Sequence, residues 1–175
     1  ILAVGFANRK QGNDLIGAIL DLAEESDEQQ AYLNLLAISC LESATEVSPE
    51  IRERVSSVLD SMIPPKTSQH TKQLSAAGNL AVPHLQPQKG FSEFETAYCV
   101  QVLGLIGTHA SLYKMALYIR DKRKLVRDAV LFALDRTHPR DIASSGLGKC
   151  LLELFDEFII NGRLRVNGVF LNALS

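Results

Sequence analysis

Apolar residues recur at intervals of three and four along almost the whole of this 175-residue chain, a spacing typical of helices that bury one face. The apolar segments are roughly 10–18 residues long, which suits helices and exceeds ordinary strands. Short polar or proline-containing stretches separate them, such as Glu24–Glu28 and Ile63–Pro65. Because short connections place successive helices antiparallel, we predict an all-α fold of antiparallel helix pairs.

Two helix starts carry especially clear signals. Ser48, Pro49 and Glu50 suit the N-cap, the first turn and the positive end of the helix dipole. Ser92 and Glu95 have the spacing of a capping box. Further helices are expected over residues 15–22, 31–41, 71–80, 109–120, 125–134 and 147–158.

The helix pairs are predicted to form one α-solenoid over residues 1–160, an α-α superhelix rather than a closed bundle, because segments repeat along the chain. Its predicted parts are weaker repeats over 1–65, a linker over 64–69 and clearer repeats over 70–158. In the tail over 161–175, Leu164, Val166 and Val169 alternate with other residues, which fits either a short strand or the start of another unit.

Charge is distributed unevenly along the chain. Residues 1–65 carry 4 Lys and Arg against 11 Asp and Glu, a net charge of −7. Residues 66–175 carry 14 against 9, a net charge of +5, so the whole chain has −2. This asymmetry can mark different partners for the two ends, and exposed helix faces of different composition produce it as well. Hydrophobic residues make up 46% of the chain, which excludes a disordered protein.

The three cysteines, Cys40, Cys99 and Cys150, lie far apart in apolar stretches and form no Cys-x-x-Cys pair. We interpret them as buried, reduced thiols of a protein in a reducing compartment, the cytoplasm. No apolar run reaches the ~18 residues that a membrane span needs, so we expect no membrane partner. Because the sequence starts at Ile1 without a methionine, we expect it to be an internal piece of a longer protein.

The sequence holds no complete motif for nucleotide or metal chemistry. Gly146–Cys150 superficially resembles a phosphate-binding loop, but Ala143 stands at the first glycine and Cys150 replaces the magnesium-binding hydroxyl. The histidines are His70, His84, His109 and His138. None has a second His or Cys three or four residues away, as a zinc site would use. We therefore expect no cofactor, no metal and no catalytic residue, although an enzyme with buried, paired acids stays an alternative.

Two segments of the chain share a pattern. Phe94–Gly107 and Leu125–Asp135 each place an alanine ahead of an apolar run. These alanines, Ala97 and Ala129, occupy equivalent positions in the two segments. Repetition of this kind favours an open stack of helix pairs.

An outer helix over 109–120, a turn with Asp121 and an inner helix with the order Val-Arg-x-Ala at 126–129 resemble a HEAT-type repeat. The match covers residues 93–135. In that family an aspartate in the turn and an arginine in the second helix tie adjacent repeats together, so the resemblance implies that Asp121 and Arg127 are structural repeat markers. An acid and a guanidinium near one turn can form such a ladder of charge-assisted hydrogen bonds.

A wider resemblance rests on the order of several segments. An apolar helix pair over 1–45 precedes Ser48–Val55, then Leu74–Leu85 and the repeat unit follow, and Leu154–Phe158 comes last. This order resembles the helical region that follows the ATPase module in bacterial NACHT-type signalling NTPases of the STAND class. It implies a non-catalytic scaffold or sensor segment of a signalling or defence NTPase, which binds a protein ligand or its own ATPase core. The nucleotide chemistry would then lie outside this chain.

Basic residues gather in the turn ahead of the helix predicted over 125–134, with Arg127 one helical turn further on. The residues of the turn are Arg120, Lys122, Arg123 and Lys124. Equivalent turns of a solenoid line one edge, so this cluster is a candidate site for an acidic protein surface or for phosphate backbones. The alternative function is therefore a nucleic-acid-binding helical repeat. An exposed turn with a structural Arg127 explains the same residues, and the absence of Trp weakens stacking on single strands.

Overall fold

The structure is a computed structural model, and it describes residues 9–44, 46–151 and 153. All regular secondary structure in these residues is helical, which confirms the predicted all-α fold. The α-helices are α2 (Arg9–Glu25), α3 (Gln30–Ser43), α4 (Pro49–Ser61), α5 (Ser68–Ser75), α6 (Glu93–Ile106), α7 (His109–Met115), α8 (Lys124–Asp135) and α9 (Pro139–Ser144). The 3-10 helices are η1 (Gly78–Leu80), η2 (Val82–His84) and η3 (Ala116–Tyr118).

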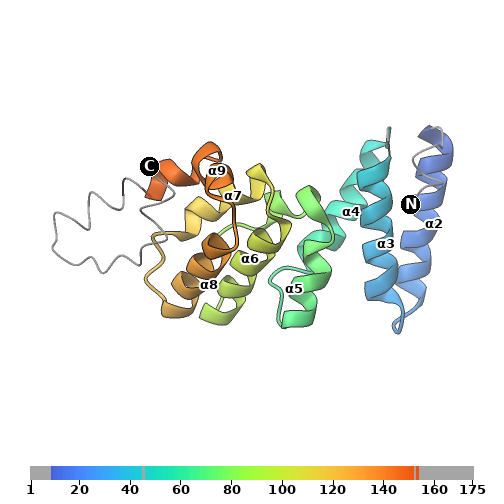
Figure 1. The fold of residues 1–175 in the computed structure, drawn as a ribbon. Helices are drawn as coiled ribbons and strands as arrows, with labels where there is room; N and C mark the ends of the chain where they lie inside the picture. Colours follow the sequence, from blue (N-terminus) through green and yellow to red (C-terminus); the bar gives the residue numbers. More distant parts are fainter. Residues whose placement is uncertain (1–8, 45, 152, 154–175) are drawn as a thin grey trace.

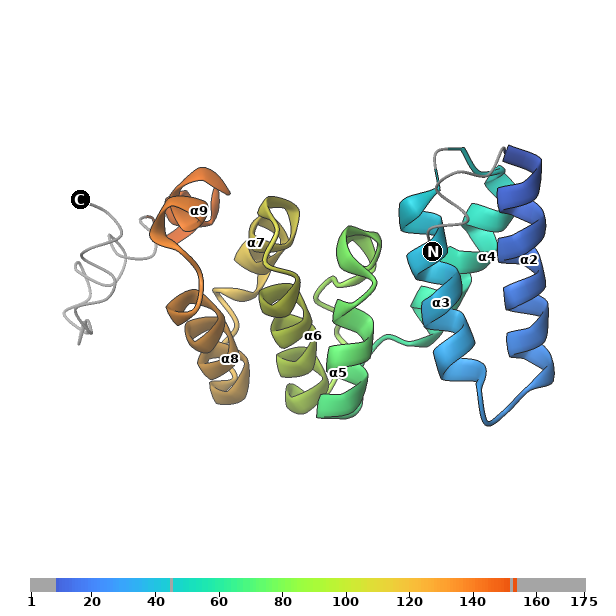
Figure 2. The ribbon, with the colours of Figure 1, turned by 45° about the vertical axis from the view of Figure 1, so that its right-hand side comes forward.

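The helices form an elongated stack, which has two layers in its C-terminal part (Figures 1 and 2). One layer contains α5, α6 and α8, which lie side by side with their N-termini at the same edge of the molecule. The other layer contains η2, α7 and α9, and α7 contacts both of its neighbours there. At the N-terminal end, α2 and α3 pack antiparallel and α4 packs against both.

Helix starts follow local signals in the sequence. The Ser48 side chain accepts a hydrogen bond from the Ile51 amide at the start of α4. Ser92 and Glu95 form the predicted capping box of α6, in which each side chain accepts from the other residue's backbone amide. The side-chain caps of α5, α7 and α9 are Thr67, Thr108 and His138.

Some predicted boundaries differ from those in the structure. The helix expected over 71–80 is α5, which ends at Ser75 and is followed by η1 and η2. Gly78 has a φ of +54°, and a residue in this left-handed conformation cannot continue an α-helix. The linker expected over 64–69 is the segment 62–67, because Thr67 already caps α5.

A single apolar interior runs through the described part of the chain. Large, fully buried side chains fill the space between the two layers: Leu74, Leu85, Leu103, Leu112, Met115 and Leu147. The corresponding residues among α2, α3 and α4 are Ile16, Leu20, Ile38 and Val55. His84 Nδ1 lies 2.7 Å from Asp60 Oδ1, so a polar contact links η2 to the end of α4 across the linker.

Gly104 lets α6 and α8 approach closely. A Cβ at this position would lie 2.7 Å from the Ala133 Cβ, well inside van der Waals contact. We expect Gly104→Ala to lower the free energy of unfolding by about 1–2 kcal/mol, despite the higher helix propensity of alanine. Urea denaturation measures the loss. Gly104→Ala/Ala133→Gly restores a single methyl group at the crossing and should be more stable than the sum of its single changes predicts; additive losses would contradict the close approach.

Residues 147–151 and 153 are helical, in agreement with the start of the helix expected over 147–158. The rest of that helix and the tail expected over 161–175 lie outside the described residues. None of the helices in the described ranges combines the length and the apolar character that crossing a bilayer requires.

Candidate functional site

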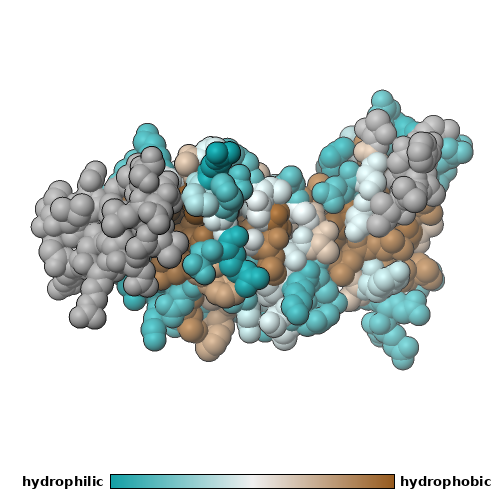
Figure 3. Space-filling view, viewed as in Figure 1, coloured by the Kyte–Doolittle hydropathy of each residue, from teal (hydrophilic) through white to brown (hydrophobic). Residues whose placement is uncertain are grey.

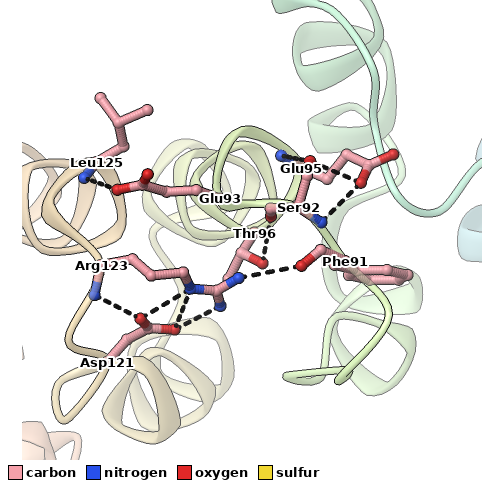
Figure 4. Close-up of polar contacts among 8 residues, drawn as sticks. All are labelled: Phe91, Ser92, Glu93, Glu95, Thr96, Asp121, Arg123 and Leu125. Carbon is pink, nitrogen blue, oxygen red and sulfur yellow. Dashed lines mark hydrogen bonds and ion pairs between the residues drawn. The ribbon is translucent and has the colours of Figure 1, made fainter.

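The turn before α8 is tied to the turn before α6 through Arg123. Its guanidinium donates from Nε to Asp121 Oδ1 at 2.9 Å and from Nη2 to Asp121 Oδ2 at 2.6 Å. The remaining nitrogen, Nη1, donates to the Phe91 carbonyl oxygen at 3.0 Å. Because the two turns precede neighbouring helices of one layer, this arginine connects two successive units of the stack (Figure 4).

A second contact between the same turns comes from Glu93. Its Oε1 accepts a hydrogen bond from the Leu125 amide at 2.7 Å, an amide in the first turn of α8 that has no partner within the helix (Figure 4). Together, the contacts from Arg123 and Glu93 fix the N-terminal ends of α6 and α8 relative to each other.

The two residues that the HEAT-type resemblance implies as structural repeat markers, Asp121 and Arg127, lie in different surroundings. Asp121 pairs with Arg123, whereas Arg127 is exposed on α8. The reason is proximity, since Arg123 follows Asp121 by two residues and its side chain folds back over the turn. Hydrogen bonds from Arg123 hold the pKa of Asp121 below its ordinary value, against a weaker opposing effect of burial. They also raise the pKa of the guanidinium.

The basic residues of the predicted turn differ in their exposure to solvent. Arg123 is half-buried and engaged in the contacts to Asp121 and Phe91, so it has a structural role. The other basic residues of the turn are exposed: Arg120, Lys122 and Lys124. The part of this candidate site that a partner can reach is therefore smaller than the sequence implied.

The histidines and cysteines do not come together in the described part of the chain. Among residues 9–44, 46–151 and 153, no group of three His, Cys, Asp or Glu side chains is arranged to hold a metal ion. Cys40 and Cys99 are buried and Cys150 is half-buried, and all are free thiols. Burial raises the pKa of the Cys99 thiol to about 12, so this thiol stays protonated at neutral pH. In the rejected phosphate-loop segment, Gly148 packs against the backbone of Ala143.

Tyr118 is buried near the charges of Arg123 and Asp121, and its hydroxyl has no hydrogen-bond partner among the described residues. Burial raises the pKa of this hydroxyl above its ordinary value, chiefly by desolvation. An unpaired buried hydroxyl is unfavourable, so Tyr118→Phe should raise the free energy of unfolding by about 1 kcal/mol in urea denaturation. Tyr113→Phe changes an exposed hydroxyl and serves as the control with no effect. A destabilised Tyr118→Phe would instead mean that the hydroxyl is hydrogen-bonded.

Exposed apolar side chains lie on the outer side of α6 and α8. Phe94 and Leu105 on α6 are 64% and 58% exposed, and Phe132 on α8 is 59% exposed. We call these three residues the α6–α8 face. The Arg136 guanidinium stands 5.1 Å from the centre of the Phe132 ring, a cation–π contact that orients this aromatic side chain.

The helical register places the three side chains on the same side of the layer. Phe94 and Leu105 are eleven residues apart, which returns to the same face of a helix after three turns. Gly104 lies against Ala133, so Leu105 and Phe132, their chain neighbours, stand at the same height. Because α7 and η3 cover the inner side of these helices, the exposed residues point away from the second layer. Figure 3 shows hydrophobic surface in this region, interrupted by hydrophilic side chains, and a larger hydrophobic area over α3.

Sequence analysis did not identify the α6–α8 face or the contacts from Phe91 and Glu93. The helix over 93–106 is apolar nearly all round, so its pattern does not show which side neighbours cover. The Phe91 contact uses a backbone carbonyl, which leaves no signal in the side-chain pattern.

In comparisons with known proteins, no protein-family model, no curated protein and no solved structure matches the chain.

Proposed function

We propose that this chain is a non-catalytic helical-repeat scaffold that binds a protein partner through the α6–α8 face. The observation that carries the proposal is the position of Phe94, Leu105 and Phe132, each more than half exposed, on one side of two helices that pack against each other. Single exposed apolar residues are ordinary, but aromatic side chains that gather on one face are typical of protein-binding surfaces.

The rigid backing of this face supports the proposal. Contacts at two levels hold α6 and α8 together. The contacts from Arg123 and Glu93 join their N-terminal ends, and Gly104 lies close to Ala133 near their C-terminal ends. A surface that is ordered before binding loses less conformational entropy when the partner docks. These contacts support a surface that is ordered before a partner binds.

We further propose that the stack is a HEAT-like superhelix and that the chain is the helical region of a cytoplasmic NACHT-type STAND signalling or defence NTPase in bacteria. The two-layer arrangement of α5 to α9 and the role of Asp121 in the turn between units support the repeat assignment. The partner is then a protein ligand or the ATPase core of the same NTPase. This proposal assigns no catalytic step and no cofactor to the chain.

Affinity purification with the chain as bait, in native and variant forms, tests the α6–α8 face. Phe94→Ser/Phe132→Ser should reduce recovery of the bound protein by about tenfold or more, because buried aromatic anchors contribute most of the energy of such interfaces. Tyr113→Ser is the matched control, since Tyr113 is an aromatic residue with 67% exposure on α7 in the other layer. Equal recovery with both variants would exclude the α6–α8 face as the binding surface.

A further inference from the structure

A line of lysines follows the edge where α5, α6 and α8 begin. Lys66 stands just before α5, Lys89 lies in the turn before α6, and Lys122 and Lys124 lie at the start of α8. We call these four residues the basic edge. Sequence analysis identified only the last two, because the topology of the stack is needed to bring the turns together.

Contacts between the turns establish that the four lysines share one edge. Arg123, between Lys122 and Lys124, bonds to the Phe91 carbonyl, two residues after Lys89. The Lys66 ammonium is near enough to Glu95, in the first turn of α6, to contribute to the lowered pKa of that carboxyl, after its stronger hydrogen bonds with Ser92. Both ribbon views place the N-termini of α5, α6 and α8 at this edge (Figures 1 and 2).

The acids of the edge accept hydrogen bonds from within the described part of the chain, and of the three only Asp121 is hydrogen-bonded to a cation there. Glu93 accepts from the Leu125 amide, Glu95 from Ser92, and Asp121 from Arg123. The four lysines are exposed, and none forms a hydrogen bond or an ion pair with the part of the chain that the structure describes. Glu93 and Glu95 keep their negative charge, because their donors are neutral. The four lysines and Arg123 still outnumber the three acids, so these eight residues carry a net charge of +2.

The shape of the basic edge favours a polymer with evenly spaced negative charges. Packed helices lie about 8–10 Å apart, so three neighbouring helix starts span roughly 20 Å. One strand of a duplex presents a phosphate about every 3.4 Å along its axis and covers this length with several phosphates. Lysine binds phosphate as a mobile point charge and needs no fixed geometry. Phe91, the aromatic residue nearest to Lys89 in sequence, is half-buried, and the exposed Phe94 lies on the α6–α8 face.

We propose that the basic edge, Lys66, Lys89, Lys122 and Lys124, binds the phosphate backbone of a duplex nucleic acid without reading its sequence. This activity is separate from the proposed protein-binding function, because it uses the edge of the layer and not the α6–α8 face. The net charge of −7 over residues 1–65 confines the contact to the C-terminal units. Binding should therefore involve few phosphates.

Fluorescence anisotropy with labelled DNA and RNA duplexes of about 20 base pairs tests the proposal. With four lysine contacts, the logarithm of the association constant should fall against the logarithm of salt concentration with a slope of about −3.6, or roughly 10²-fold between about 50 and 200 mM. Lys122→Ala/Lys124→Ala should reduce the slope by about 2. Lys10→Ala/Lys149→Ala is the control with the same change in net charge, since both lysines are exposed, Lys10 on α2 and Lys149 after α9, outside the layer of α5, α6 and α8.

We expect the native chain to bind at least one of the two duplexes. Replacement of Lys122 and Lys124 should weaken this binding, and the control variant should bind as tightly as the native chain. No binding at about 50 mM salt, or equal weakening by both double variants, would overturn the proposal. Poly-L-glutamate serves as a competitor at equal charge. If it displaces the duplex as effectively as unlabelled duplex does, the edge is a site for acidic protein and the nucleic-acid proposal is wrong. Phe94→Ser/Phe132→Ser should bind duplex normally, so failure of this proposal and failure of the protein-binding function are separable.

Discussion

Leu103→Ala is expected to lower the free energy of unfolding by about 2–5 kcal/mol, whereas Leu105→Ala, two residues along the same helix, should change it by less than about 0.5 kcal/mol. Leu103 is fully buried and faces the second layer, while Leu105 is 58% exposed on the α6–α8 face. Truncation of Leu103 leaves a cavity, because the surrounding helices relax only in part. Truncation of Leu105 removes a side chain that already meets water.

The two variants also separate stability from binding. Urea denaturation followed by circular dichroism measures unfolding, and affinity purification measures the bound partner. Leu105→Ala should lose partner without losing stability, while Leu103→Ala should lose stability. If both changes destabilise the chain equally, the side of α6 that neighbours cover has been assigned wrongly.

Asp121→Ala is expected to lower the free energy of unfolding by about 2 kcal/mol, because it removes charge-assisted hydrogen bonds from a half-buried guanidinium. Arg127→Ala is the informative control. A role of Arg127 in tying adjacent repeats together predicts a comparable loss, whereas its exposed position on α8 predicts less than about 0.5 kcal/mol. The effects of Asp121→Ala and Arg123→Ala should be strongly non-additive, since each removes the same contact. Additive effects would contradict the pairing.

The same ion pair sets a dependence on pH. Since the pKa of Asp121 is lowered in the folded chain, its stabilising effect is fully present above the unfolded pKa of about 3.9. The effect is lost as pH falls through the lower folded pKa. The stability difference between the native chain and Asp121→Asn should therefore shrink below about pH 4. A difference that stays constant down to pH 2 would show that the carboxylate charge makes no contribution.

Local signals in the sequence were sufficient for much of the fold. The Ser48 cap and the Ser92–Glu95 capping box depend on residues within one turn of each other, and both form as predicted. The all-α fold follows from helical periodicity and is confirmed. The break after Ser75 was missed, because the left-handed conformation of Gly78 depends on its surroundings, including the Glu42 side chain close by.

The candidate sites needed contacts between units, and a single sequence does not contain them. Asp121 was identified correctly as a polar residue of the turn, but its partner depends on how the Arg123 side chain folds back. Lys66 and Lys89 are unremarkable in sequence and become part of one edge only when α5 and α6 lie side by side. The exposure of Phe94 and Leu105 depends on which neighbours pack against an almost wholly apolar helix.

Site-specific photo-crosslinking tests the binding function of the α6–α8 face most directly. A photoreactive phenylalanine analogue at Phe132 should form a discrete covalent adduct with the proposed protein partner. The same analogue at Tyr113, equally exposed in the other layer, should not. The adduct should disappear when Leu105→Ala is added, since Leu105 and Phe132 stand at the same height on one face. Adducts of equal yield from both positions, or an adduct from Tyr113 alone, would contradict the assignment of this face as the binding surface.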